Sequence, residues 1–233
     1  MDVAGIVFDK DGTLIDFSGT WDRFAQDLIE ELSGGATELA ARLADAMDFD
    51  LAAGTFRATS RIIAGTSREA AECVQSALPD RSLDEVENLM AERAAVAQMA
   101  PVVPLGPYCA GLKAAGFKLG VATNDSEAVA QANLRTLGLT GVFDFVAGYD
   151  SGFGGKPDAG MLTAFANAMA LAPQTCVMVG DSPHDLIAAQ RAGFRSVGVL
   201  TGVCDHDTLA PLCEVVLSDI GHLPNWLGLK PAP

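Results

Sequence analysis

The polar residues of this chain that could do chemistry each follow a short apolar run or a glycine-rich loop. They are Asp9 and Asp11, Thr123 and Asn124, Lys156, and Asp181. Carboxylates can act as nucleophiles, as proton donors and acceptors, and as ligands of a hard cation, whereas threonine and lysine can donate hydrogen bonds to an anion. Ligands of an open parallel sheet bind beyond the carboxyl ends of its strands, so these residues are expected to meet in one cleft.

Six apolar runs are expected to form the strands that position these residues. They span Val3–Phe8, Phe117–Thr123, Val142–Tyr149, Thr175–Val179, Arg195–Leu200 and Glu214–Leu217. Continuous apolar runs of this length are typical of strands buried on both faces of a parallel sheet. Helices are predicted between them over residues 106–115, 126–137, 158–170 and 183–192, with glycine or proline at several of their ends. This alternation predicts an α/β fold with a doubly wound, mostly parallel, Rossmann-like sheet.

Residues 17–100 interrupt this alternation and contain no strand-like run. Apolar residues such as Trp21 and Leu28 recur there at helical spacing, and Ser82-Leu83-Asp84-Glu85 is a capping box that opens a helix. Breaks at glycine and proline divide the segment into four or five helices. The expected organisation is an α/β core domain, residues 1–16 and 101–233, with an inserted all-helical domain, residues 17–100.

Four motifs in this order resemble those of the haloacid dehalogenase (HAD) superfamily. They are Asp9-Lys10-Asp11-Gly12-Thr13-Leu14, then Thr123, then Lys156-Pro157, then Gly180-Asp181-Ser182 with Asp185 three residues further on. The resemblance covers the whole chain, because a helical insertion between the first and second motifs is similar to an α-helical C1-type cap. The phosphoglycolate-phosphatase-like branch of the superfamily fits best.

The resemblance assigns roles to these residues. Asp9 would attack phosphorus and carry a transient aspartyl phosphate, and Asp11 would act as general acid and then as general base. Gly12 would permit the turn that lets both carboxylates serve the site. The groups expected to hold the phosphate are Gly12, Thr123, Asn124 and Lys156.

An acidic cluster that faces an anionic substrate needs a hard cation, and oxygen ligands beside phosphate favour Mg²⁺. The resemblance assigns this ion to the side chains of Asp9 and Asp181 and to the backbone carbonyl of Asp11. Asp185 is expected to support the metal or Lys156 from behind. An alternative for Asp185 is a plain helix-capping role opposite Ser182.

Residue counts separate the activities known in this superfamily. Between Asp16 and Ala100 there is no lysine and no histidine, which argues against the phosphonoacetaldehyde hydrolase and β-phosphoglucomutase types, because these need such residues in the cap. Haloacid dehalogenases lack the second aspartate, present here as Asp11. A phosphatase remains, acting on a small phosphorylated metabolite, with 2-phosphoglycolate as the leading candidate. Many relatives have Ser where Phe17 follows Asp16, a departure that leaves the floor of the substrate pocket open to question.

An arginine fork in the cap would suit the carboxylate of 2-phosphoglycolate. The candidates are Arg23, Arg57, Arg61 and Arg68. Arg61 is favoured because it lies in a weakly patterned stretch, although most such arginines are solvated surface charges.

Two other classes of function stay open. One is a phosphorelay receiver domain, which the Asp-x-Asp pair and the long insertion argue against. The other is a catalytically inert binding protein of the same fold, which the intact motifs argue against.

The whole chain of 233 residues carries Lys+Arg 15 against Asp+Glu 30, a net charge of −15. This charge disfavours nucleic acid and anionic membranes as partners. Five scattered cysteines indicate reduced thiols rather than a zinc site or a disulfide framework. We expect a cytoplasmic protein that is a monomer or a small homo-oligomer.

Overall fold

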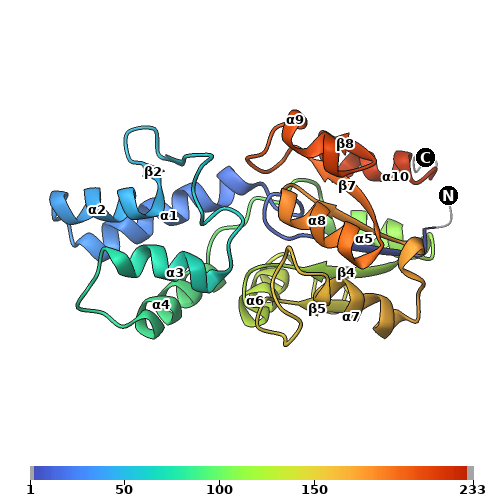
Figure 1. Ribbon diagram of the computed structural model, residues 1–233, viewed down its shortest axis with the longest axis horizontal. Coiled ribbons are helices and arrows are strands. Elements are labelled where there is room, and N and C mark those ends of the chain that lie inside the picture. Colours follow the sequence, from blue (N-terminus) through green and yellow to red (C-terminus); the bar gives the residue numbers. More distant parts are fainter. Residues whose placement is uncertain (1–2, 230–233) are drawn as a thin grey trace.

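The computed structural model of the chain describes residues 3–229. Figure 1 shows two lobes, one containing a sheet with helices around it and the other containing helices α1 to α4. Residues 1–2 and 230–233, which the sequence prediction assigned to the core domain, lie outside the described residues.

The larger lobe is built on a six-stranded sheet with the strand order β5-β4-β1-β6-β7-β8, in which all neighbouring strands are parallel. The strands are β1 (Gly5–Phe8), β4 (Lys118–Ala122), β5 (Phe145–Ala147), β6 (Cys176–Gly180), β7 (Arg195–Val199) and β8 (Val215–Leu217). All six lie within or overlap the predicted runs, and the chain reverses direction across the sheet beside β1. The prediction of a doubly wound parallel α/β sheet is confirmed.

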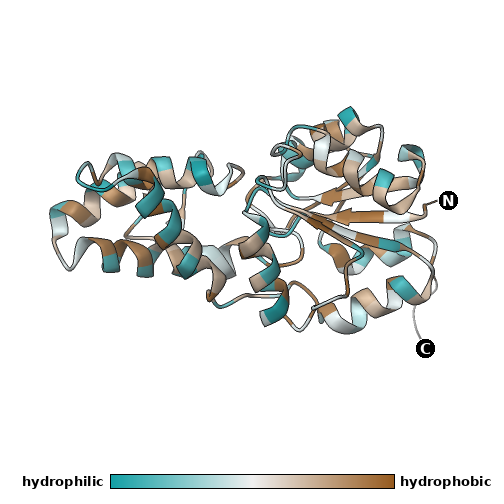
Figure 2. Cartoon of the chain, turned by 90° about the horizontal axis from the view of Figure 1, so that it is seen from below, coloured by the Kyte–Doolittle hydropathy of each residue, from teal (hydrophilic) through white to brown (hydrophobic). Residues whose placement is uncertain are grey.

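Helices cover both faces of this sheet. Helices α5 (Leu105–Ala114), α6 (Glu127–Thr136) and the short α10 (Leu223–Trp226) pack on one face, and α7 (Gly160–Met169) and α8 (Pro183–Ala192) pack on the other. Side chains of β1 alternate between the two layers, because successive residues of a strand point to opposite faces. Figure 2 shows the resulting apolar interior around the strands and polar residues on the outer helix surfaces.

The smaller lobe, called the cap below, lies between β1 and α5 in the chain. It consists of α1 (Phe17–Ser33), α2 (Thr37–Met47), β2 (Phe49–Asp50), β3 (Thr55–Phe56), α3 (Ser67–Ser76) and α4 (Leu83–Ala95). Its helices enclose a separate apolar core that includes Leu28, Leu43 and Val74. The predicted capping box at Ser82 is present: its hydroxyl accepts a hydrogen bond from the Glu85 amide, and Glu85 accepts one from the Ser82 amide.

The prediction of an all-helical insertion needs one correction. Strands β2 and β3 form a small antiparallel hairpin. The Asp50 carboxylate accepts hydrogen bonds from the amides of Ala52 and Ala53, and Gly54 adopts a positive φ of 70° at the end of the turn. Two residues per strand are too few to produce a period-two pattern, so the hairpin leaves no clear signal in the sequence.

The two chain segments that join the lobes run beside each other. The Asp16 amide donates to the carbonyl of Ala100 over 2.8 Å, and Ile15 forms an antiparallel bridge with Pro101. Asp16 also caps α1, because its carboxylate accepts a hydrogen bond from the Gly19 amide. A search of the described chain for a helix that could span a membrane finds none.

Candidate active site

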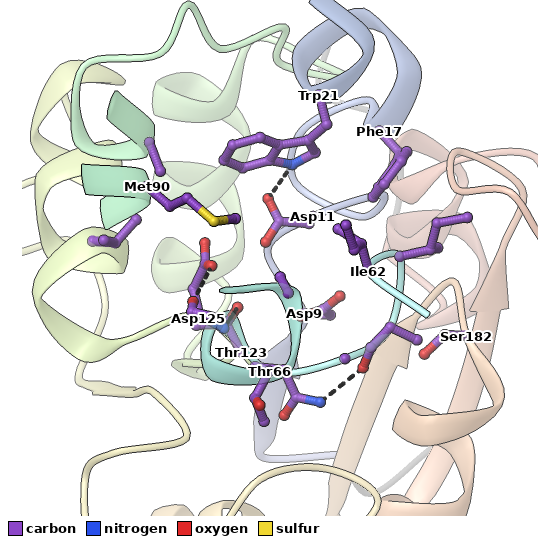
Figure 3. A pocket seen from close by; sticks show the side chains of 18 of the residues that line it. Asp9, Asp11, Phe17, Trp21, Ile62, Thr66, Met90, Thr123, Asp125 and Ser182 are labelled. Atoms are coloured by element: carbon purple, nitrogen blue, oxygen red, sulfur yellow. Dashed lines mark hydrogen bonds between the residues drawn. The ribbon is translucent and has the colours of Figure 1, made fainter. Parts of the chain in front are cut away.

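A pocket between the cap and the carboxyl edge of the sheet contains most of the predicted site residues. From the core, the pocket is lined by Asp9, Asp11, Thr123, Asn124, Asp125, Val129, Lys156, Asp181, Ser182 and His184. Figure 3 shows Asp9, Asp11 and Thr123 on the core side, with Trp21, Phe17, Ile62 and Met90 on the cap side. The ends of β1, β4 and β6 therefore bring their polar residues to one place.

Asp9 follows β1 and forms a short ion pair with Lys156. Its Oδ1 lies 2.6 Å from the Lys156 ammonium, which lies 2.6 Å from Asp185 Oδ1. Burial raises the pKa of Asp9 to about 7, with Lys156 pulling it down and Asp185 raising it further. Burial disfavours the charge of Lys156, but Asp185 and Asp9 outweigh that effect and hold its pKa above the ordinary value. Lys156 is thus a fixed cation that faces the Asp9 carboxylate.

Asp185 fulfils both of the roles considered from the sequence. Its Oδ1 accepts from Lys156, while its Oδ2 accepts from the amide and hydroxyl of Ser182 and so caps α8. Asp185 is completely buried. The helix cap therefore fixes the carboxylate that orients Lys156.

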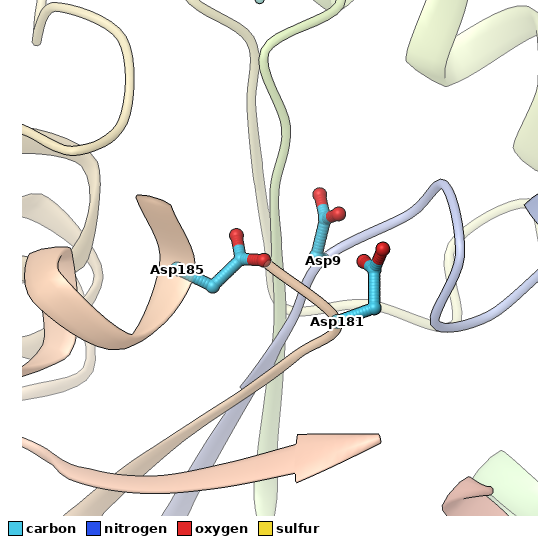
Figure 4. Close-up of side chains that lie close together, drawn as sticks. All are labelled: Asp9, Asp181 and Asp185. Atoms are coloured by element: carbon cyan, nitrogen blue, oxygen red, sulfur yellow. The ribbon is translucent and has the colours of Figure 1, made fainter. Parts of the chain in front are cut away.

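Asp9, Asp181 and Asp185 form a buried acidic cluster, in which one carboxylate oxygen from each lies within 4.8 Å of the others (Figure 4). Burial, followed by repulsion from Asp9 and Asp185, raises the pKa of Asp181 well above its ordinary value. Since the cluster offers oxygen atoms and carries more negative than positive charge, it fits a hard divalent cation. Both oxygens of Asp185 already accept hydrogen bonds, so Asp9 and Asp181 are the better placed ligands.

Gly12 allows the β1 loop to approach Asp181 closely. It has a φ of 76°, and a Cβ atom built on it would lie 2.4 Å from Asp181 Oδ2. Gly12 is not among the residues that line the pocket. The structure shows its close approach to Asp181, and its predicted phosphate contact stays a prediction.

Asp11 points away from this cluster and is held by two donors. Its Oδ1 accepts hydrogen bonds from the Lys10 ammonium over 2.9 Å and from the Trp21 indole over 2.7 Å. Burial raises the pKa of Asp11, and Lys10 opposes this. The cap helix α1 thus helps to orient a carboxylate of the core.

Lys10 was not singled out from the sequence. Its side chain is fully buried, and its ammonium also lies 2.7 Å from Asp125 Oδ2 and 2.9 Å from Asn133 Oδ1. A lysine between two aspartates after a buried strand was the available signal. Such a residue would be taken for a solvated loop lysine unless the positions of Asp125 and Asn133 were known.

Asn124 lines the pocket, but its side chain is hydrogen-bonded within the protein, and its predicted phosphate contact stays a prediction. Its side-chain amide donates to the carbonyls of Ala64 and Lys156, and its side-chain oxygen accepts from the Lys156 amide. The side chain therefore connects the cap at Ala64, the loop after β4 and the loop that contains Lys156. Thr123 stays at the pocket, where its hydroxyl accepts from the Asp125 amide over 3.1 Å and keeps its own hydrogen free to donate.

The cap arginines do not line the pocket. Arg61, the favoured candidate, is exposed, and its charge lies near Glu69 and Cys73. The loop containing Arg61 turns its neighbours Ile62 and Ile63 towards the pocket instead, so the predicted substrate contact of Arg61 is corrected here. Arg68 is paired with Asp84 and Glu87.

These strand-end acids, the buried lysine and the inserted cap define a class of phosphate-processing hydrolases, and comparison with known proteins agrees. A family model for haloacid dehalogenase-like hydrolases matches residues 3–193. The chain belongs to this family and is a phosphatase. Members of the family generally use a divalent metal.

Within the family, the chain is similar to phosphoglycolate phosphatases. The one from Neisseria meningitidis serogroup A is 30% identical over 97% of this chain and 89% of the relative. The one from Agrobacterium fabrum is 30% identical over 93% of this chain and 89% of the relative.

Solved structures agree with the fold. CbbY from Rhodobacter sphaeroides, crystallised with phosphate, has a TM-score of 0.67 at 21% identity and covers 95% of this chain and 96% of its own. L-2-haloacid dehalogenase from Xanthobacter autotrophicus has a TM-score of 0.66 at 18% identity and covers 97% and 98%.

Proposed function

We propose that this protein is a magnesium-dependent phosphatase that hydrolyses a small phosphorylated metabolite through an aspartyl phosphate on Asp9. The observation that carries the proposal is the position of Asp9. It lies at the end of the central strand β1, 2.6 Å from a buried lysine, in a pocket that also contains Asp11, Thr123 and Asp181.

In the first step, an oxygen of Asp9 attacks phosphorus while the bond to the leaving alcohol breaks. Lys156 favours the ionised form of Asp9 against the effect of burial and aims its carboxylate, and the Thr123 hydroxyl and the Lys156 ammonium hold the phosphoryl oxygens. Asp9 and Asp181 side chains, with the Asp11 carbonyl, would hold Mg²⁺, which supplies charge neutralisation at the phosphoryl group.

Asp11 transfers the protons. It protonates the oxygen of the leaving alcohol and then takes a proton from the water that hydrolyses the aspartyl phosphate. Lys10 and Trp21 hold its carboxylate in place. Its raised pKa favours the protonated form that the first step needs.

Similar proteins are named phosphoglycolate phosphatases, so 2-phosphoglycolate is the first substrate to test.

The Asp9→Asn variant tests the proposal. Turnover of p-nitrophenyl phosphate with Mg²⁺ should be lost while the circular dichroism spectrum and melting temperature stay near those of the unmodified protein. Beryllofluoride should inhibit the unmodified enzyme, and a chelator should stop it until Mg²⁺ is restored. Near-native turnover by a sequence-verified Asp9→Asn variant would sink the proposal.

A further inference from the structure

The cap side of the pocket is almost entirely apolar. Its apolar lining residues come from six parts of the cap and are Phe17, Trp21, Phe24, Met47, Phe56, Ile62, Ile63, Ala64, Ala70, Met90, Ala91 and Ala94. Four of them pack in pairs: the rings of Phe17 and Phe56 pack edge to face, as do those of Trp21 and Phe24. This wall is a continuation of the cap's own core.

The charge on this wall has the sign of the substrate's phosphate. Among the described cap residues that line the pocket, Glu87 is the one charged side chain. It is fixed by two donors, since Arg68 donates to its Oε2 and the Tyr149 hydroxyl donates to its Oε1 over 2.6 Å. A carboxylate on the substrate would therefore meet a second carboxylate.

No positive side chain of the described cap lines the pocket. Arg68 is bound by Asp84 and Glu87, Arg57 pairs with Asp48, and Arg23 lies within 3.7 Å of Asp27 on the exposed side of α1. Arg61 is exposed and outside the lining. On the core side, Lys156 is already committed to Asp9 and Asp185.

The pocket is also small. Its cavity volume is about 110 Å³, and an apolar cavity of about 150 Å³ accepts benzene. This volume includes the space beside Asp9, Asp11 and Lys156 that the phosphate must occupy, so the alcohol part of the substrate must be small.

We infer that the alcohol released by this enzyme is small, uncharged and mainly apolar, and that 2-phosphoglycolate is a poor substrate. The inference rests on the proposed phosphatase function. The apolar wall gains by covering an alkyl or aryl group, whereas a carboxylate placed against it would lose its water and meet no cationic side chain of the described cap. The phosphate end is recognised by the core residues and is common to both kinds of ester.

A pair of substrates of matched shape tests the inference. The compounds 3-methylbutyl phosphate and 2-carboxyethyl phosphate differ in carrying a dimethyl or a carboxylate end at the same position. With Mg²⁺, kcat/KM for the alkyl ester should exceed that for the carboxylate ester and for 2-phosphoglycolate by at least about tenfold. Equal or better hydrolysis of either carboxylate ester would overturn the inference and leave the phosphatase proposal intact.

Two variants test whether the pocket wall determines the preference for the alkyl ester. Met90→Arg puts a cation on the α4 wall and should shift the ratio of the two kcat/KM values towards the carboxylate ester by about tenfold or more. The matched control is Val96→Arg, which adds the same charge just beyond α4 at a side chain that is 77% exposed and outside the lining. It should leave the ratio unchanged. Equal shifts in both variants would show that the pocket wall does not determine the substrate preference.

A binding measurement separates the two proposals. Benzylphosphonate and phosphonoacetate cannot be hydrolysed, and they carry an apolar ring and a carboxylate respectively. Calorimetry on the Mg²⁺-loaded protein should give at least about tenfold tighter binding of benzylphosphonate. Tighter binding of phosphonoacetate would overturn the inference. Failure to hydrolyse every ester, p-nitrophenyl phosphate included, would instead count against the proposed function.

Discussion

Lys10 keeps its charge although no part of its side chain reaches solvent. Burial disfavours the ammonium, but Asp11 and Asp125 outweigh that effect and hold the pKa of Lys10 above its ordinary value. The Trp21 ring lies beside it, with its centroid 5.1 Å from the ammonium. The position of Asp11, the proposed proton donor, therefore depends on a residue that does not line the pocket.

Replacing Lys10 by methionine should impair proton transfer more than binding. We expect kcat for an alkyl phosphate to fall by about 10- to 100-fold with little change in KM, because the general acid is no longer aligned. The loss should be much smaller for p-nitrophenyl phosphate, whose leaving group needs little protonation. Lys118→Met, at an exposed lysine at the start of β4, is the matched control. Equal losses of kcat with both substrates would show that Lys10 has only a structural role.

Asp181 and Asp185 should respond in opposite ways to replacement by asparagine. Asp181→Asn removes a buried carboxylate that repels Asp9, so the metal-free protein should melt a few degrees higher. Asp185→Asn breaks its pair with Lys156 and should cost about 3 kcal/mol of unfolding free energy.

Thermal melting with and without Mg²⁺ checks this prediction. Mg²⁺ should raise the melting temperature of the unmodified protein, because it binds only the folded state. It should have little effect on Asp181→Asn. A lower melting temperature for metal-free Asp181→Asn would contradict the assignment of Asp181 to a repulsive cluster.

At the scale of elements, the backbone of the loop after β1 is tightly constrained at Gly12. Gly12→Ala adds a Cβ at a position with a φ of 76° and places it against the Asp181 carboxylate. We expect Mg²⁺ affinity and kcat to fall by at least about tenfold, since Asp181 must move.

Gly138→Ala is the control for backbone strain. Gly138 follows α6 with a φ of 72°, and a Cβ there would meet nothing within 4 Å. It should cost only about 1 kcal/mol of unfolding free energy, with unchanged kinetics. Similar kinetic losses in both variants would show that strain, and not the contact with Asp181, limits the Gly12 site.

Much of this architecture is local enough to be predicted from the sequence. The buried strands appear as apolar runs, and the capping boxes at Ser82 and Ser182 lie within four residues. The acids at strand ends follow from the topology of a parallel sheet. Helix α7 begins at Gly160, two residues after the predicted Asp158, which is an ordinary boundary error.

The parts that escaped prediction depend on packing between distant segments. The apolar pocket wall combines residues of α1, α2, β3, the loop at Ile62, α3 and α4, and no local pattern shows that they face one site. Arg61 lies next to two pocket residues in sequence, but it is exposed and outside the pocket lining. Lys10 could be recognised only once Asp125 and Asn133 were placed.

At the scale of the whole molecule, polar contacts join the two lobes around the pocket. The Ser67 hydroxyl donates to Asp125 over 2.8 Å, the Ala64 carbonyl accepts from Asn124, and the Tyr149 hydroxyl donates to Glu87. Opening of the cap must break these contacts, so they favour the closed arrangement.

The two tyrosines of the chain offer a matched test of this idea. Tyr149→Phe removes a bond between the lobes, so KM for a good substrate should rise on the order of tenfold. Amide exchange in α4 should become faster. Tyr108→Phe removes a bond to the Ile220 carbonyl within the core and should leave KM and exchange in α4 unchanged. Identical KM values for the two variants would contradict a closing role for Tyr149.

Asn133 links helix α4 of the cap to Lys10 of the core. Its side-chain oxygen accepts from Lys10, and its amide donates to the carbonyl of Ala94 in α4 over 2.9 Å. When α4 moves away, the buried amide loses its acceptor, and the support of Lys10 and of Asp11 weakens with it. Asp11, the proposed proton donor, is therefore expected to be fully aligned only while the cap is closed. Such an interlock would keep the open enzyme from cleaving esters too large for the cap to cover.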